Sequence, residues 1–509
     1  MLFRIASASL AGIEAYPVEV EADISLGFPQ FITVGLPDPA VRESKERVKA
    51  ALRNCGYDIN ARKITINLAP ADRKKEGSAF DLPIALGFLA QQGIFPPERL
   101  RDYLFVGELA LDGRLKPVPG VLPIAILVKR LGLQGLVVPH ANEKEAALVP
   151  GLVVYGLRDL VQVIGLLNGV QDIHPSAWRP EDLMTPPAYT VDFQEVKGQQ
   201  HVKRALEVAA AGGHNVLLVG PPGAGKTMLA RRLPTILPLM TFDEMLDVTQ
   251  VYSAAGLLQD AGAVSRRPFR APHHTITDAG LVGGGVIPRP GEVSLAHHGV
   301  LFLDELPEFR RRVLEDLRQP IEDGRITVSR SAMSSTFPAS FMLVAAMNPC
   351  EDVFRGMGGG KADCTESQRS RYYSKISGPL LDRIDIHLDV PEVKFRDIVS
   401  KEEAESSADI RKRVSAAREI QLTRFKGRKV YSNARMGPRD VRRFCAIGEE
   451  GEKLLETAVT KLGFSARAYD RVLKVARTIA DLAGELEIGT AHISEAVQYR
   501  MMDRVRRAD

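Results

Sequence analysis

The sequence predicts an α/β protein with three parts: a first region of mixed strands and helices, a central parallel sheet, and a helical C-terminal region. Short apolar runs at residues 215–219, 299–303, 341–346 and 384–390 are separated by helical patterns. Such continuous runs are typical of parallel strands that are buried on both faces. From about residue 394 the pattern is helical and charged. At about 150 residues per domain, the length of 509 residues also predicts about three domains.

The composition is that of an ordinary globular protein, with 45% hydrophobic and 26% charged residues. No window approaches 18 consecutive apolar residues, so we expect no membrane association, and the first residues do not resemble a signal peptide. Four cysteines in so long a chain favour a reducing, cytoplasmic location. Residues 394–509 carry 25 basic and 18 acidic side chains. This excess is consistent with nucleic-acid binding, although a solvated helical face is the commoner explanation.

The first region contains strand patterns at residues 31–34, 64–68 and 103–109. A helix is predicted after Asp38, which can cap it, with Pro39 at its first position and Gly56 at its end. A proline-rich stretch follows this region and reads as a linker. The predicted boundaries are a first domain at 1–170, a linker at 171–190, a core at 191–393 and a helical domain at 394–509.

A phosphate-binding loop follows the strand at 215–219, where the segment GPPGAGKT fits the pattern G-x-x-x-x-G-K-T. Glycines in such a loop let backbone N–H groups and a helix N-terminus turn toward phosphate. Lys226 would reach the β- and γ-phosphates, and the Thr227 hydroxyl would ligate Mg²⁺. The candidate nucleotide-binding residues are Gly220, Pro221, Pro222, Gly223, Ala224, Gly225, Lys226, Thr227 and Met228.

Two acidic residues, Asp304 and Glu305, end the apolar run VLFL about 80 residues downstream. Asp304 is the second candidate Mg²⁺ ligand, and Glu305 is the candidate that polarises the attacking water. Asn348 follows another apolar run and suits a sensor of the γ-phosphate or water, although an ordinary strand-ending asparagine is the alternative.

Two arginines are candidates for neutralising charge in the transition state. Arg383, in the segment LLDRID, suits an arginine finger. Arg467 opens a helix in the segment SARAYDR. Taken alone, Arg467 is more typical of an ordinary solvated arginine.

With this order of motifs, the chain resembles AAA+ ATPases of the magnesium-chelatase-like branch, and most closely the competence-protein ComM (YifB-like) family. The shared segments are RAPHHT at 270–275, PGEVSLAHHG at 290–299 and DELPEF at 304–309. The opening segments LGFP and VGLPD match as well, so the resemblance covers essentially the whole chain. It implies a P-loop AAA+ core followed by a helical lid.

The resemblance further implies an ATP- and Mg²⁺-dependent motor that forms a hexameric ring, with each ATP between two subunits. Arg383 would then act on the neighbour's nucleotide, and Arg467 would act from the lid. Segments 255–293 and 324–340 would line the central pore. The implied partner is single-stranded or branched DNA, bound without regard to sequence. The implied activity is branch migration in homologous recombination during natural transformation.

Three arginines on these inserts are candidate DNA contacts: Arg270, Arg325 and Arg330. Residues 326–331 alternate as a hairpin arm does, which predicts Arg325 and Arg330 near its tip, where they would suit salt-dependent phosphate contacts. Exposed hairpins with ordinary charges are the alternative. The histidine pairs 273–274 and 297–298 are not predicted metal ligands, because adjacent side chains on a strand point apart.

Residues 1–170 resemble the Lon-type protease domain, a fold similar to domain 2 of ribosomal protein S5. Ser78 lies where that family has its nucleophile, but the position of the dyad lysine falls at Leu122, six residues after Lys116. Without that lysine nothing removes the hydroxyl proton, so no protease activity is expected. A helix over residues 78–92 with Ser78 as its N-cap is predicted instead.

Many ComM-like proteins carry two C-x-C pairs whose spacing resembles a four-thiolate zinc site. Here the first pair is reduced to Cys350 with Asp352, and the second to Ala362 with Cys364. No structural zinc is therefore expected, and the two cysteines are predicted to be free thiols or a remnant pair.

Two other functions remain open beside the DNA motor. One is a chelatase motor subunit that drives metal insertion into a tetrapyrrole, although such subunits generally lack the Lon-like domain. The other is a protein-remodelling AAA+ module that binds no nucleic acid. Stimulation of ATP hydrolysis by DNA separates the motor from both alternatives.

Overall fold

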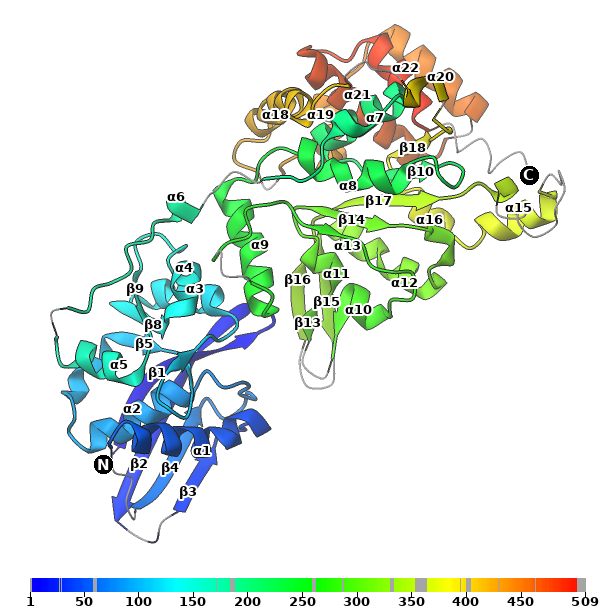
Figure 1. Cartoon of the computed structure of the whole chain (residues 1–509). Helices are drawn as coiled ribbons and strands as arrows, with labels where there is room; N and C mark the ends of the chain where they lie inside the picture. Colours follow the sequence, from blue (N-terminus) through cyan, green and yellow to red (C-terminus); the bar gives the residue numbers. More distant parts are fainter. Residues whose placement is uncertain are drawn as a thin grey trace. The chain divides into compact units, whose positions relative to one another are not determined.

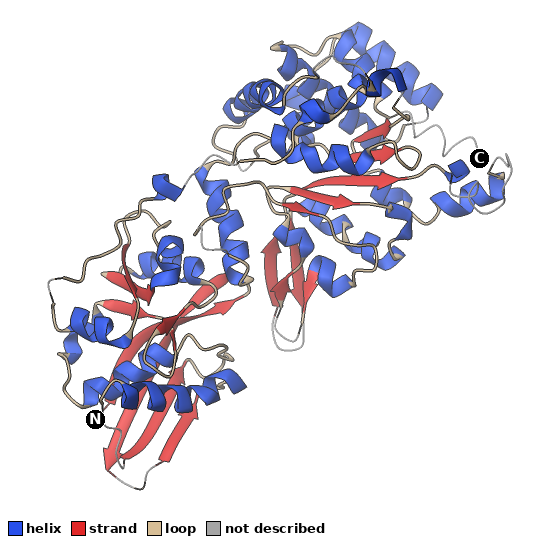
Figure 2. Cartoon of the chain, in the orientation of Figure 1, coloured by secondary structure: helices blue, strands red, loops and turns tan. Residues whose placement is uncertain are grey.

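The helices and strands of the computed structural model fall into two compact units (Figures 1 and 2). The first comprises Met1–Pro186 with Thr241–Ser265, and the second comprises Pro187–Met240 with Arg266–Asp509. The structure describes residues 2–26, 28, 30–57, 62–170, 172–183, 188–258, 262–285, 288–329, 334–352, 364–393, 395–399, 404–428, 430–462 and 464–500. Within these residues, no helix has the length and apolar character needed to cross a membrane.

The first unit is built on a four-stranded sheet in the order β1-β2-β4-β3, in which only the β3–β4 pair is parallel. A three-stranded parallel sheet, β5-β8-β9, and a small antiparallel pair, β6-β7, complete it. The strands are β1 (Leu2–Ala11), β2 (Glu14–Leu26), β3 (Gln30–Val34), β4 (Arg62–Ala69), β5 (Tyr103–Phe105), β6 (Glu108–Leu109), β7 (Leu115–Lys116), β8 (Gly135–Pro139) and β9 (Val153–Leu157).

Helix α1 has the predicted cap, because the Asp38 carboxylate accepts a hydrogen bond from the Val41 N–H at 2.8 Å. The helices and 3-10 turns of this unit are α1 (Pro39–Asn54), α2 (Asp81–Gln91), η1 (Pro97–Arg101), α3 (Val121–Leu131), η2 (His140–Asn142), α4 (Glu143–Ala146), α5 (Leu160–Leu167), α6 (Pro180–Leu183) and α9 (Phe242–Ala254).

The prediction that Ser78 caps a helix is wrong. Helix α2 begins three residues later, after Phe80, and its first residue, Asp81, is fully buried. The Asp81 carboxylate accepts hydrogen bonds from the Arg47 guanidinium at 2.7 and 3.0 Å, and this ion pair fixes the start of the helix. The Ser78 hydroxyl donates to Glu108 instead.

Helix α9 belongs to the first unit, whereas the sequence boundaries place its residues in the 191–393 core. Gln250 donates to the Ile13 carbonyl at 2.9 Å, and the Ser253 carbonyl accepts from the Gly120 N–H at 3.0 Å. The Ser253 hydroxyl also donates to the buried carboxylate of Glu145. These contacts depend on residues more than 100 positions apart, so local sequence patterns do not reveal them.

The second unit contains a five-stranded parallel sheet in the order β11-β14-β17-β10-β18. Four of its strands are the apolar runs that the sequence predicts, and the two-residue β11 is an addition. The strands of this unit are β10 (Val216–Val219), β11 (Phe269–Arg270), β12 (Gly283–Gly284), β13 (Arg289–Pro290), β14 (Val300–Leu303), β15 (Arg325–Ser329), β16 (Ser334–Pro338), β17 (Met342–Met347) and β18 (Ile386–Asp389).

The described residues from 395 onward form helices, as predicted, and α18 and α21 pack on α7 of the core. The helices and 3-10 turns of this unit are η3 (Phe193–Glu195), α7 (Gln200–Gly212), α8 (Lys226–Ile236), α10 (Asp278–Val282), α11 (Glu292–Leu295), η4 (Leu306–Glu308), α12 (Arg311–Asp316), α13 (Arg318–Asp323), α15 (Glu366–Tyr373), α16 (Gly378–Leu381), α17 (Phe395–Ile398), α18 (Ser407–Arg424), η5 (Asn433–Arg435), α19 (Pro438–Phe444), α20 (Glu449–Leu462), α21 (Ala466–Ala483) and α22 (Thr490–Gln498).

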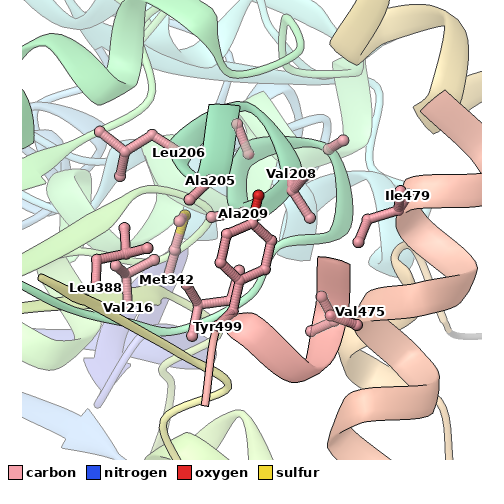
Figure 3. Packing of buried hydrophobic residues seen from close by; sticks show 14 of the residues in the cluster. Ala205, Leu206, Val208, Ala209, Val216, Met342, Leu388, Val475, Ile479 and Tyr499 are labelled. Atoms are coloured by element: carbon pink, nitrogen blue, oxygen red, sulfur yellow. The ribbon is translucent and has the colours of Figure 1, made fainter. Parts of the chain in front are cut away.

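A single hydrophobic core joins the parallel sheet to the C-terminal helices (Figure 3). Val216 of β10, Met342 of β17 and Leu388 of β18 belong to the same buried cluster as Val475 and Ile479 of α21. Ala205, Leu206, Val208 and Ala209 of α7 lie in this cluster as well, together with Tyr499. The helical region therefore cannot shift without disturbing the apolar side chains that hold the sheet.

Candidate functional site

The loop between β10 and α8 lies at the carboxyl edge of the parallel sheet, and α8 begins at Lys226. Gly223 and Gly225 have φ values of +84° and +86°, a region that favours glycine. A Cβ atom on Gly220 would lie 2.2 Å from the Val390 carbonyl oxygen. The glycines of the motif thus satisfy a conformational and a packing requirement, and they turn the loop around the start of α8.

The Lys226 ammonium folds back onto oxygen atoms of the loop and of a neighbouring strand end. It donates to the carbonyls of Gly220 at 2.5 Å and Pro221 at 2.9 Å, and to Asn348 Oδ1 at 2.9 Å. Burial lowers the pKa of Lys226, while Asp304 and Asp352 oppose that effect. In the described part of the chain the hydrogen bonds of this buried cation go to neutral oxygens, an environment that suits an anionic ligand such as phosphate.

Thr227 and Asp304 meet although they are 77 positions apart in the sequence. The Thr227 hydroxyl donates to Asp304 Oδ2 at 2.6 Å, and Asp304 Oδ1 accepts from the Glu305 N–H at 3.0 Å. A hydroxyl and a carboxylate oxygen side by side are the donors that Mg²⁺ takes from a protein when phosphates supply others. The residues present therefore fit a Mg²⁺–nucleotide complex.

Asn348 follows the end of β17, the strand between β14 and β10 in the sheet. Its side chain accepts from Lys226, and its backbone carbonyl accepts from the Tyr372 hydroxyl at 2.9 Å. The structure thus brings together Lys226, Thr227, Asp304 and Asn348, which come from three strand ends of one edge.

Glu305 adopts a left-handed backbone conformation with φ +52°, which is strained for a residue other than glycine. Its carboxylate lies 3.3 Å from His274 Nδ1, and the His274 ring also packs edge-on against Phe309. Nothing in the local sequence marks His274 as a neighbour of Glu305. Their proximity follows from the pairing of β11 with β14, which brings the residues after both strands to the same edge.

Arg383 and Arg467 lie at the opposite, amino edge of the sheet. Arg383 precedes β18, and its backbone carbonyl accepts from Asn215, the residue before β10. Its guanidinium lies 2.5 Å from Glu322 Oε1. Arg467 is the second residue of α21 and lies near enough to Glu322 to help lower the pKa of that carboxyl, after the larger effect of Arg383.

A buried carboxylate, Asp385, organises this amino edge. Arg471 donates to it, the Asn215 N–H donates at 2.9 Å, and His214 Nδ1 lies 3.6 Å away. Burial alone would raise the pKa of Asp385, but Arg471 and His214 outweigh it and hold the pKa well below its usual value. The charge of Asp385 therefore ties α21 to the start of β10.

Comparisons with known proteins agree with this arrangement. Models of magnesium chelatase match the chain in three places: subunit ChlI at residues 192–398, subunit ChlI of Mg-chelatase at 20–142, and the ChlI C-terminal region at 404–500. Competence protein ComM of Haemophilus influenzae is 44% identical over 504 residues, which cover 98% of this chain and 97% of that protein. The chain belongs to the ComM/YifB family of magnesium-chelatase-like proteins.

Two further relatives show how this family stands beside the chelatases. YifB of Escherichia coli is 44% identical over 496 residues, covering 97% of this chain and 96% of that protein. The magnesium-chelatase 67 kDa subunit of Chlorobaculum tepidum is 29% identical over 171 residues, covering 32% of this chain and 24% of that protein. Likeness to the ComM/YifB proteins extends over the full length, whereas likeness to this chelatase subunit covers a part.

The candidate DNA-binding arginines of this ComM/YifB-family chain have different surroundings. Arg270 forms a two-pronged ion pair with Glu292 at 2.6 and 2.7 Å. The prediction that Arg325 lies near the hairpin tip is wrong: Arg325 is the first residue of β15 and pairs with Pro338 at the base of the hairpin, where it is exposed. Arg330 lies outside the described residues.

The two cysteines near the Asn348 strand end are joined. Cys350 and Cys364 form a disulfide in the structure, with Cα atoms 6.1 Å apart. Glu351, next to Cys350, forms an ion pair with Arg369 of α15 at 2.5 Å. Asp363 lies outside the described residues.

Proposed function

We propose that this protein is an ATPase that works as a ring-forming DNA motor. In this proposal Lys226 binds the β- and γ-phosphates, and Thr227 and Asp304 hold Mg²⁺, which neutralises charge that develops on the phosphoryl oxygens. Glu305 accepts the proton of the attacking water, and Asn348 orients that water. The contacts among Lys226, Thr227, Asp304 and Asn348 support these roles.

The single observation that carries the ring is the placement of the two arginines. Arg383 and Arg467 lie at the amino edge of the sheet, whereas the phosphate loop of the same chain lies at the carboxyl edge. The five residue-to-residue steps from Asn215 to Gly220 span roughly 16 Å of extended strand. In this proposal a hexameric ring brings Arg383 to the loop of a neighbour, whereas Arg467 acts from the lid.

DNA is the proposed substrate, with branch migration in recombination during natural transformation as the activity and the cytoplasm as its location. The full-length likeness to a protein named for competence supports this substrate. The exposed face of the β15–β16 hairpin supports it too. Thr327 lies beside Thr336 and Ser329 beside Ser334, with hydroxyl oxygens 3.0 Å apart in both pairs, and such hydroxyls and Arg325 are groups that contact phosphates.

We propose a non-proteolytic, Lon-like role for residues 1–170, an ATPase core at 191–393 and a lid at 394–509. The contacts of Ser78 support the first assignment. Its hydroxyl donates to Glu108, and Lys116 Nζ lies 3.8 Å from the other oxygen of that carboxylate. Among the described residues, Lys116 is thus paired with Glu108 rather than with the Ser78 hydroxyl.

The deciding experiment measures ATP hydrolysis by the full chain with and without single-stranded or forked oligonucleotides of unrelated sequences. We expect stimulation by DNA of any sequence. In the variant Arg325→Ala, the slope of the logarithm of DNA affinity against the logarithm of salt concentration should flatten by about 0.7 for each lost phosphate contact. ATP hydrolysis that does not respond to DNA would favour a chelatase-type or protein-remodelling ATPase.

A further inference from the structure

We propose that Glu322 is a positioning residue for Arg383: it holds the guanidinium inside its own subunit and releases it when the β15–β16 hairpin is displaced. This inference rests on the proposed function, because it takes Arg383 as the arginine that serves a neighbouring subunit. Under this proposal, occupancy of the hairpin by DNA sets the rate of hydrolysis in the next subunit of the ring.

Arg383 is withdrawn from solvent in the conformation that the structure describes. Its side chain is only 7% exposed, Nη2 lies 2.5 Å from Glu322 Oε1, and Nη1 donates to the Pro379 carbonyl at 2.6 Å. A guanidinium that stabilises charge on another subunit must present its N–H groups at the surface. By contrast, Arg467, near the same carboxylate, is exposed.

One hydrogen-bond donor of the Arg383 guanidinium also lacks an acceptor among the described residues in this position. Among the described residues, the buried Nε of Arg383 has no hydrogen-bond partner. A buried donor without an acceptor is unfavourable, so this conformation is held by its other contacts. A phosphate group can accept two hydrogen bonds from one guanidinium, which would also satisfy Nε. A second conformation, in which the guanidinium binds phosphate, would therefore become favourable for Arg383 once its ion pair with Glu322 is broken.

Glu322 is close in sequence to the hairpin that would contact the DNA. It lies in the last turn of α13, and only Asp323 and the left-handed Gly324 (φ +65°) separate it from Arg325, the first residue of β15. Its side chain is 48% exposed. The hydrogen bond from Arg383 is the main reason that the pKa of Glu322 lies below its usual value, so the carboxylate is charged at neutral pH.

A second arginine holds both ends of the hairpin segment at its base. Arg435 donates to the Ile321 carbonyl at 2.8 Å and to the Phe341 carbonyl at 3.2 Å. Ile321 immediately precedes Glu322, and Phe341 follows the second hairpin strand. The base of the hairpin is held at these two carbonyls. Displacement of the hairpin by DNA would therefore rotate the backbone around Gly324 and change the distance between the Glu322 carboxylate and the Arg383 guanidinium.

The test compares Glu322→Gln with Asp323→Asn in the full chain. Both variants remove one negative charge from the end of the same helix, and Asp323 is exposed. Without DNA, we expect Glu322→Gln to hydrolyse ATP roughly fivefold faster, the factor associated with losing a partly exposed ion pair. Added single-stranded DNA should then give little further stimulation. Asp323→Asn should behave as the unmodified protein does.

The double variant Glu322→Gln/Arg383→Ala separates positioning from a general structural effect. If Glu322 acts through Arg383, the double variant hydrolyses no faster than Arg383→Ala alone. Glu322→Asp keeps the charge with a shorter reach and should give a smaller increase. Thermal melting shows whether each variant is folded, and Glu322→Asp provides the test if Glu322→Gln is not.

An unchanged or reduced basal rate in folded Glu322→Gln would overturn the proposal. So would an increase that persists without Arg383. The unmodified protein with DNA tests the proposed function separately. If DNA fails to stimulate it while Glu322→Gln still raises the basal rate through Arg383, the positioning role stands and the DNA substrate is wrong.

Discussion

The two edges of the parallel sheet in the second unit differ in how their residues are assembled. At the carboxyl edge, Lys226, Thr227, Asp304 and Asn348 contact one another directly. At the amino edge, Arg383 and Asp385 come from one short segment, but their partners Glu322, Asn215 and Arg471 come from three other elements. Parallel strands deliver the residues that follow them to one edge, so chemistry there can be read from motifs. The ion pairs at the amino edge join residues from separate elements, so local motifs do not reveal them.

The largest effect is expected from Arg383→Ala, which tests whether the amino edge completes the neighbour's site. Loss of an arginine finger lowers the hydrolysis rate by about 10³- to 10⁵-fold, while ATP binding should persist. Hydrolysis and nucleotide binding are measured on the same preparation.

Mixing Arg383→Ala with Lys226→Ala sharpens this test. A mixed ring contains interfaces where an intact loop of one subunit faces an intact Arg383 of the next, so some activity should return. Rings that demonstrably mix but stay inactive at every ratio would show that Arg383 acts within its own chain.

Glu305→Gln addresses the carboxyl edge and should have the next largest effect. Loss of a general base lowers the rate by about 10²- to 10⁴-fold, whereas the contacts of Lys226 and Thr227 with phosphate and Mg²⁺ remain. The variant should therefore bind ATP with near-normal affinity and retain it. Near-normal turnover would mean that another group accepts the proton, and His274, 3.3 Å from Glu305, would be the first to examine.

The same contrast explains how far the sequence predicts the structure. The four long strands of the sheet follow from apolar runs, and the cap of α1 by Asp38 follows from a local pattern. The start of α2 does not, because the buried Asp81–Arg47 ion pair determines it. Likewise, the docking of α9 on the first unit and the pairing of Arg383 with Glu322 depend on distant residues.

Asp385→Ala tests whether the amino edge is held by charge. Because Arg471 and the Asn215 N–H would lose a buried partner, the free energy of unfolding should fall by about 3–5 kcal/mol. The folded pKa of Asp385 is depressed, so its stabilisation is complete above the ordinary aspartate value of about 4 and is lost as the pH falls through the folded pKa. Denaturant unfolding at neutral and acidic pH measures this.

Asp323→Ala, at an exposed position, is the matched control and should change stability little at either pH. The difference between Asp385→Ala and the unmodified protein should shrink in acid. A difference that is constant across the pH range would mean that packing around Asp385, rather than its charge, holds the edge.

The smallest effect is expected from replacing Cys350 and Cys364. Cys350 lies two residues beyond Asn348, where the chain leaves the carboxyl edge. A structural zinc there would tie this edge to α15 through Cys364, but zinc of that kind usually takes four cysteine or histidine ligands. Cys350 and Cys364 are joined in a disulfide and, even when reduced, would offer two thiolates, while the neighbouring Glu351 is already paired with Arg369. We therefore expect elemental analysis of protein purified without a metal-affinity tag to find no stoichiometric zinc, and replacing both cysteines with serine to leave ATP hydrolysis nearly unchanged. One zinc per chain that disappears in the serine variant would contradict this prediction. It would show that the carboxyl edge, like the amino edge, is held by contacts between residues from separate segments.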